Sequence, residues 1–87
     1  MGIMNSESAE RVGIGTWAKV TGFVPGEEEV FHIVPETEAD ILKNKIPPSS
    51  PLARALDGTK PGDRIMFRPP AGRVELTVLD VGRHKST

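Results

Sequence analysis

The chain has 87 residues and no Cys, which allows one small domain and excludes both a disulfide framework and a cysteine-based zinc site. Its polar start is unlike a signal peptide, and no run approaches the roughly 18 apolar residues of a transmembrane helix, so we expect a cytoplasmic protein without membrane contact. The formal net charge of -1 divides unevenly, because residues 1–40 hold eight acids and two bases, whereas residues 41–87 hold nine bases and four acids. The sequence leaves open whether these halves form separate surface patches.

The first predicted elements form a hairpin. Residues 1–12 have no periodicity and are expected to be a flexible leader. Residues 16–24 and 30–34 are rich in β-branched and aromatic residues. Pro25 and Gly26 between them suit a type II turn, so the pattern predicts two antiparallel strands.

A short helix is predicted after an irregular stretch over residues 36–49. Ser50 is an N-cap type, Pro51 suits the first helical position, and Gly58 suits the left-handed position after the last turn. The apolar residues between them recur at helical spacing, so the helix should have one buried face.

A second hairpin closes the chain. Residues 64–68 and 74–81 alternate apolar and polar side chains on either side of a Pro-rich turn. Leu79 and Val81 move the apolar side chains to the other face, so the end of that strand is expected to be covered on both faces. The element order predicts one α+β domain over residues 13–83, a mostly antiparallel sheet of two hairpins with one short helix packed on it, followed by a loose tail at 84–87.

The sequence offers little for catalysis. His32 lies within a predicted strand and His84 in the tail, and neither belongs to a cluster with metal-ligand spacing. Glu27, Glu28 and Glu29 are consecutive, so on a strand they would not converge on a cation. We therefore expect no cofactor, no metal site and no catalytic residues. The stiff loop at residues 47–51 is either a partner-binding feature or simply the turn that caps the helix.

The motif SSPLARAL at residues 49–56, followed by Gly58, Gly62 and Asp63 and by a PAGR turn, resembles the C-terminal domain of the GreA/GreB family of bacterial transcription elongation factors. The resemblance implies an FKBP-like fold that docks on bacterial RNA polymerase, at the rim of the secondary channel and against a coiled coil of the largest subunit. It implies no direct sequence-specific contact with nucleic acid. Carried over by position, the docking residues are Ser49, Ser50, Pro51 and Leu52.

One part of that family's pattern has no counterpart in the sequence. Gre factors stimulate transcript cleavage with an N-terminal coiled coil whose acidic tip helps to hold Mg²⁺, and only twelve residues precede the expected domain here. We therefore expect no cleavage stimulation. The alternatives are an FKBP-type prolyl isomerase, for which the four aromatic residues are few, and an interaction regulator of another enzyme, such as nucleoside diphosphate kinase.

Overall fold

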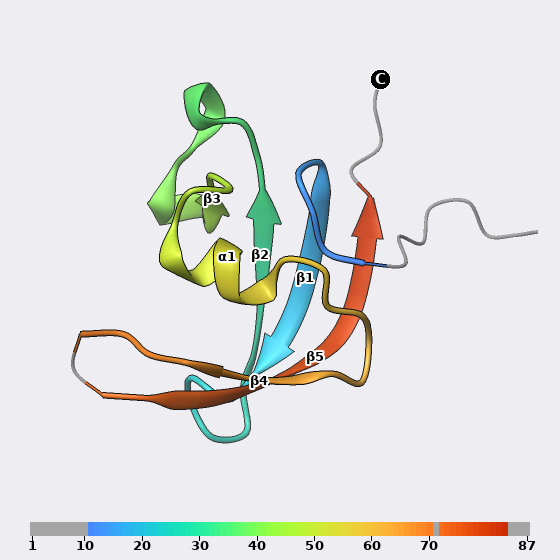
Figure 1. The fold of residues 1–87 in the computed structure, drawn as a ribbon, viewed down its shortest axis with the longest axis vertical. Helices are drawn as coiled ribbons and strands as arrows, with labels where there is room; N and C mark the ends of the chain where they lie inside the picture. Colours follow the sequence, from blue (N-terminus) through green and yellow to red (C-terminus); the bar gives the residue numbers. More distant parts are fainter. Residues whose placement is uncertain (1–10, 71, 84–87) are drawn as a thin grey trace, which may run out of the picture.

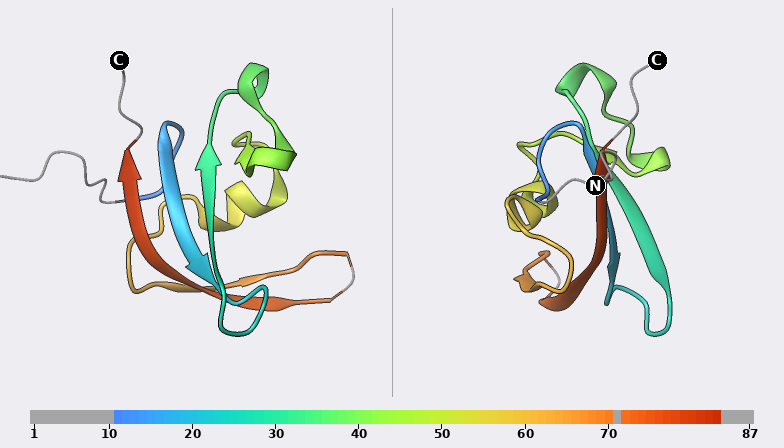
Figure 2. Two further views of the ribbon diagram at one scale, coloured as in Figure 1. Left: turned by 180° about the vertical axis from the view of Figure 1, so that it is seen from behind. Right: turned by 90° about the vertical axis from the view of Figure 1, so that its right-hand side faces the viewer.

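The computed structural model describes residues 11–70 and 72–83. Its five strands are β1 (Thr16–Thr21), β2 (Glu28–Ile33), β3 (Lys45–Ile46), β4 (Arg64–Phe67) and β5 (Val74–Arg83), with one α-helix, α1 (Pro51–Leu56). They form a single sheet in the order β3-β2-β1-β5-β4, and α1 packs on one of its faces (Figures 1 and 2). The expected α+β class, with two antiparallel hairpins and one short helix, is confirmed.

The first hairpin turns where its sequence predicts. Gly26 has a φ of 81°, and the Glu27 backbone N–H donates to the Val24 carbonyl over 3.0 Å, which closes the turn. The strands differ from the expected runs, because β1 ends at Thr21 and β2 already begins at Glu28. Glu28 therefore belongs to the ladder, where its carboxylate lies 3.8 Å from the ammonium of Lys19.

The stretch expected to be irregular contains three short elements. Two 3-10 helices, η1 (Glu36–Glu38) and η2 (Ile41–Lys43), lead into β3, which pairs with β2 in parallel. The Asp40 side chain accepts a hydrogen bond from the Leu42 backbone N–H and so caps η2. Asn44 then takes a left-handed conformation and donates its side-chain amide to the Val30 carbonyl. Elements this short have no periodicity that a sequence pattern could reveal.

Helix α1 forms as its sequence predicts. The Ser50 hydroxyl accepts a hydrogen bond from the Ala53 backbone N–H at 3.1 Å, and Pro51 begins the helix. After the last turn Gly58 has a φ of 79°, in the left-handed region. Ala53 and Leu56 are buried against the sheet, which holds a helix too short to be stable alone.

Strand β5 contains a bulge that the alternation did not predict. Lys19 pairs with Asp80 but Val20 pairs with Val78, so Leu79 is an extra residue in the ladder and is partly exposed. The bulge returns Val81 to the same buried face as Val78, so the expectation that Leu79 begins a covered second face was wrong. The face of β5 opposite to Val78 and Val81 is covered at Gly82, which lies against the indole of Trp17.

Val12 belongs to the packed domain, although it falls within the segment expected to be a flexible leader. Val12 is buried in the core, its backbone N–H donates to the Thr59 carbonyl, and its carbonyl accepts from the Gly58 N–H. The rest of the expected leader, apart from Arg11, and the tail at 84–87 lie outside the described residues. The fully buried side chains that centre the core come from β1, α1 and β5: Ala18, Val20, Leu56, Leu76 and Val78.

Candidate docking groove

An apolar groove of about 450 Å³ opens beside the first turn of α1. We call it the α1 groove. Residues from β2, η2, the loop that enters α1 and the end of β4 surround it, so it joins segments that are far apart in the sequence. Its lining residues are Phe31, Ile41, Asn44, Ile46, Ser50, Pro51, Leu52, Phe67, Arg68, Pro69 and Pro70.

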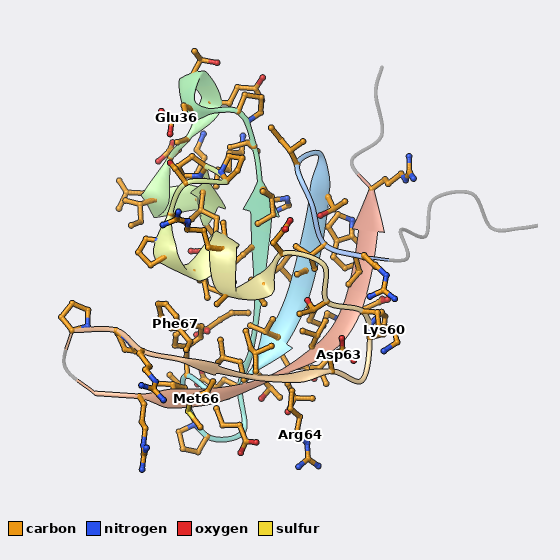
Figure 3. The ribbon with its side chains drawn as sticks, in the orientation of Figure 1. Glu36, Lys60, Asp63, Arg64, Met66 and Phe67 are labelled. Atoms are coloured by element: carbon orange, nitrogen blue, oxygen red, sulfur yellow. The ribbon has the colours of Figure 1, made fainter. Side chains whose placement is uncertain are left out.

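The alternation of β4 decides which side chains reach the groove. Phe67 points toward α1, whereas Arg64 and Met66 point to the opposite side of the strand (Figure 3). The ring of Phe23 makes edge contacts with Phe31 and Phe67, with centroids 5.8 and 6.1 Å apart. These contacts fix the two rings that line the groove, so its apolar wall is formed before any partner arrives.

The four sequence-predicted residues do not all face the groove. Ser50, Pro51 and Leu52 line it, whereas Ser49 is absent from its lining. The Ser49 hydroxyl donates a hydrogen bond to Oε2 of Glu36 over 2.5 Å, which ties the loop to η1. The Ser50 hydroxyl is occupied by its capping role. The loop therefore offers a proline ring and a leucine side chain at the groove, while its hydroxyls hold its shape.

Sequence reasoning missed several residues at the groove. Ile41 is 80% exposed at its edge, and the neighbouring Leu42 is 93% exposed. An apolar pair between Asp40 and Lys43, in a stretch with no strand or helix periodicity, was the available signal. Phe67 and Arg68 carried no such signal, because only the fold brings the end of β4 to the start of α1.

An ion pair fixes the turn before β4. The Lys60 ammonium lies 3.0 Å from Asp63 Oδ1, and the Lys60 backbone N–H donates to Oδ2 over 3.1 Å (Figure 3). The hydrogen bond from the Lys60 side chain, followed by the one from its backbone, lowers the pKa of Asp63. This turn precedes Arg64 at the start of β4, whereas the groove lies at the other end of that strand, beside Phe67.

Within residues 11–70 and 72–83, no three His, Cys, Asp or Glu side chains gather as a metal site requires. Glu28 and Glu29 are consecutive in β2, so their side chains point to opposite faces of the sheet, whereas Glu27 precedes the strand. No helix in this part of the chain is long and apolar enough to cross a membrane.

The described residues thus combine a small α+β fold with an apolar groove beside an ordered loop. The chain belongs to the GreA/GreB family, because the family model for the C-terminal domain of transcription elongation factor GreA/GreB matches residues 7–83. Members of this family are transcription elongation factors and are not enzymes by themselves.

Relatives and solved structures agree with this assignment. The chain is 40% identical over 85 residues to transcription elongation factor GreA of Streptococcus suis, covering 95% of this chain and 53% of the relative. GreA of Pseudomonas syringae is 39% identical over 74 residues, covering 85% of this chain and 46% of the relative. The structure of Gfh1, the GreA factor homolog 1 of Thermus thermophilus, superposes with a TM-score of 0.71 at 29% identity, over 97% of this chain and 55% of that one. The chain thus spans about half the length of the relatives that it matches.

Proposed function

We propose that this chain binds bacterial RNA polymerase through the α1 groove, at the rim of the secondary channel and against the coiled coil of the largest subunit. The observation that carries the proposal is the position of Ser50, Pro51 and Leu52. They are three of the four docking residues that the family resemblance implies, and they line the groove at the start of α1. A cytoplasmic location would follow from this partner.

The loop that enters α1 is suited to docking because three hydrogen bonds hold it. The Ser50 backbone N–H donates to the Pro47 carbonyl over 3.0 Å, the Ser50 hydroxyl caps α1, and the Ser49 hydroxyl bonds Glu36. A loop that is already ordered loses little conformational entropy on binding. Pro51 and Leu52 can then contribute apolar area at little further cost, as the anchor residues of an interface do.

Binding to bacterial core RNA polymerase tests the proposal. Replacing Ile41 with Asp places a charge at the edge of the groove on a side chain that is already 80% exposed, so the fold should be unaffected. We expect the Kd to rise by at least about tenfold, because an apolar contact is replaced by a desolvated carboxylate. Leu52→Asp should abolish binding.

The matched control is Met66→Asp, which also introduces a carboxylate at an exposed apolar side chain but on the opposite side of β4. Its Kd should stay within about twofold of the wild-type value. Equal effects of Ile41→Asp and Met66→Asp would contradict docking through the groove. Capture of nucleoside diphosphate kinase instead of polymerase from a bacterial lysate would favour the regulator alternative.

The 87-residue polypeptide should bind polymerase without stimulating transcript cleavage. Among residues 11–70 and 72–83, no cluster of carboxylates could help to hold a catalytic cation, and the proposal assigns these residues to docking. A stalled elongation complex with labelled RNA measures this directly. Cleavage above the rate of polymerase by itself would contradict the expectation.

A further inference from the structure

The 3-10 helix η2 exposes two neighbouring aliphatic side chains, Ile41 and Leu42, which we call the η2 knuckle. They are 80% and 93% exposed, the two largest fractions among the large hydrophobic residues that the structure describes. Ile41 lies at the edge of the α1 groove, whereas Leu42 is not among its lining residues. A single exposed aliphatic side chain is ordinary at a protein surface, but an adjacent pair beside an apolar groove indicates an interaction surface.

Hydrogen bonds hold the η2 knuckle in this exposed position. Before it, Asp40 exchanges two backbone hydrogen bonds with Lys45, at 2.8 and 2.9 Å, and its carboxylate accepts one from the Leu42 N–H. After it, the left-handed Asn44 donates its side-chain amide to the Val30 carbonyl over 3.2 Å. The turn is therefore tied to β2 and β3 at both ends, and an ordered element that displays apolar side chains loses little entropy on binding.

The geometry of a 3-10 helix separates the directions of the two side chains. With three residues per turn, neighbouring side chains point about 120° apart around the helix axis. Ile41 and Leu42 therefore present apolar surface to different sides of η2. A partner that stays within the α1 groove would reach Ile41 and leave Leu42 in water, so a partner that covers both must continue past the groove and over η2.

We infer that Leu42 is a second apolar anchor of the docking surface, outside the α1 groove, and that the partner extends across η2 and covers it with apolar side chains of its own. The partner is the part of RNA polymerase that occupies the groove, so the inference rests on the function proposed above. Polymerase is assigned because Ile41 borders the groove and adjoins Leu42, which places a partner bound in the groove next to the η2 knuckle. Burying this leucine in the complex removes apolar surface from water and so favours binding.

Two substitutions of similar length and different polarity test the role of Leu42. Leu42→Gln should raise the Kd for bacterial core RNA polymerase by about tenfold, because its amide would be desolvated without a hydrogen-bond partner. Leu42→Met keeps an apolar side chain of similar volume, so its Kd should stay within about twofold of the wild-type value. Because Leu42 is 93% exposed, neither change should move the midpoint of urea unfolding, which separates an anchor from a structural residue.

The matched control is Ile14→Gln. Ile14 is also an exposed aliphatic residue, at 59%, but it lines a separate hollow together with Arg54 and Asp57 and is absent from the lining of the α1 groove. Its Kd should stay within about twofold of the wild-type value. Equal losses for Ile14→Gln and Leu42→Gln, or for Leu42→Met and Leu42→Gln, would overturn the anchor.

The remaining outcomes separate this inference from the proposed function. If Leu42→Gln binds like the wild type while Leu52→Asp abolishes binding, the anchor is overturned and docking through the groove stands. If Leu52→Asp also binds normally, both fall. Self-association of the wild-type chain that Leu42→Gln abolishes without changing polymerase binding, measured by sedimentation, would assign the η2 knuckle to a second copy and overturn the inference.

Discussion

The contact between Gly82 and Trp17 shows how a single residue can decide whether β1 and β5 fit together. A β-carbon at Gly82 would lie 2.7 Å from the indole Nε1 of Trp17 and closer still to two ring carbons. Gly82→Ala should therefore destabilise the fold by about 2 kcal/mol, because either the ring or the strand must move. Urea unfolding followed by tryptophan fluorescence measures this change.

Gly13→Ala is the matched control for that substitution. A β-carbon at Gly13 would meet no atom within 4 Å, so the free energy of unfolding should change by less than about 0.5 kcal/mol. A stability loss for Gly82→Ala no larger than that for Gly13→Ala would show that the indole moves aside without cost.

The Asp63 carboxylate predicts a pH dependence with a definite sign. Its pKa is lowered in the folded chain by the hydrogen bonds from Lys60, so it stabilises the fold above the ordinary aspartate pKa. The stabilisation disappears as the pH falls through the lowered pKa. The difference in unfolding free energy between the wild type and Asp63→Asn should be small, because the ion pair is exposed. This difference should be largest at neutral pH and should vanish in acid. A difference that grows toward acid pH would contradict this assignment.

Helix α1 is the element on which docking depends, and its cap sets its stability. Ser50→Ala removes the acceptor for the Ala53 N–H and should lower the free energy of unfolding by about 1 kcal/mol. Ser49→Ala removes only an exposed hydrogen bond to Glu36 and should cost less than about 0.5 kcal/mol. Thermal unfolding of the two variants distinguishes a capping hydroxyl from a tethering one, and equal losses would contradict the distinction.

Elements with local signals could be predicted from the sequence, and the others could not. Ser50, Pro51 and Gly58 define α1 by backbone chemistry that acts within a few residues, and Pro25-Gly26 defines its turn in the same way. Strand β3 has only two residues, and it forms because η1 and η2 bring the chain back alongside β2, where Ile46 pairs with Ile33 in parallel. The bulge at Leu79 depends on the partner strand and leaves no local signature.

The groove residues also differ in whether a local sequence signal could predict them. The SSPL motif indicated the loop at the mouth of the groove, since that segment is contiguous in the sequence. Phe31, Ile41 and Phe67 come from separate elements, and no sequence spacing relates them. Ser49 looked like a contact residue by position, yet a partner 13 residues away, Glu36, determines where its hydroxyl points.

At the scale of the whole molecule, the sheet order shows how the acidic and the basic half of the sequence are arranged. β2 and β1 come from the acidic half of the sequence, and they lie between β3 on one side and β5 and β4 on the other, all from the basic half. The two halves therefore interleave across the sheet and do not form two opposed faces.

The domain as a whole should compete with longer relatives for polymerase. If the groove is the shared docking surface, an excess of this 87-residue polypeptide should displace labelled GreA from core RNA polymerase, and Leu52→Asp should not. Fluorescence anisotropy of the labelled factor measures displacement. A ternary complex that holds both proteins would show that they occupy different surfaces.

The edges of the sheet carry a consequence for behaviour at high concentration. β3 offers two residues at one edge, and β4 offers four at the other before Pro69 and Pro70 remove the next backbone donors. Short edge strands offer little unpaired backbone to another chain, and Pro69 and Pro70 cannot donate a hydrogen bond to one. Intermolecular strand addition, a route to aggregation in small β-rich domains, therefore has little backbone to start from at β3 and β4.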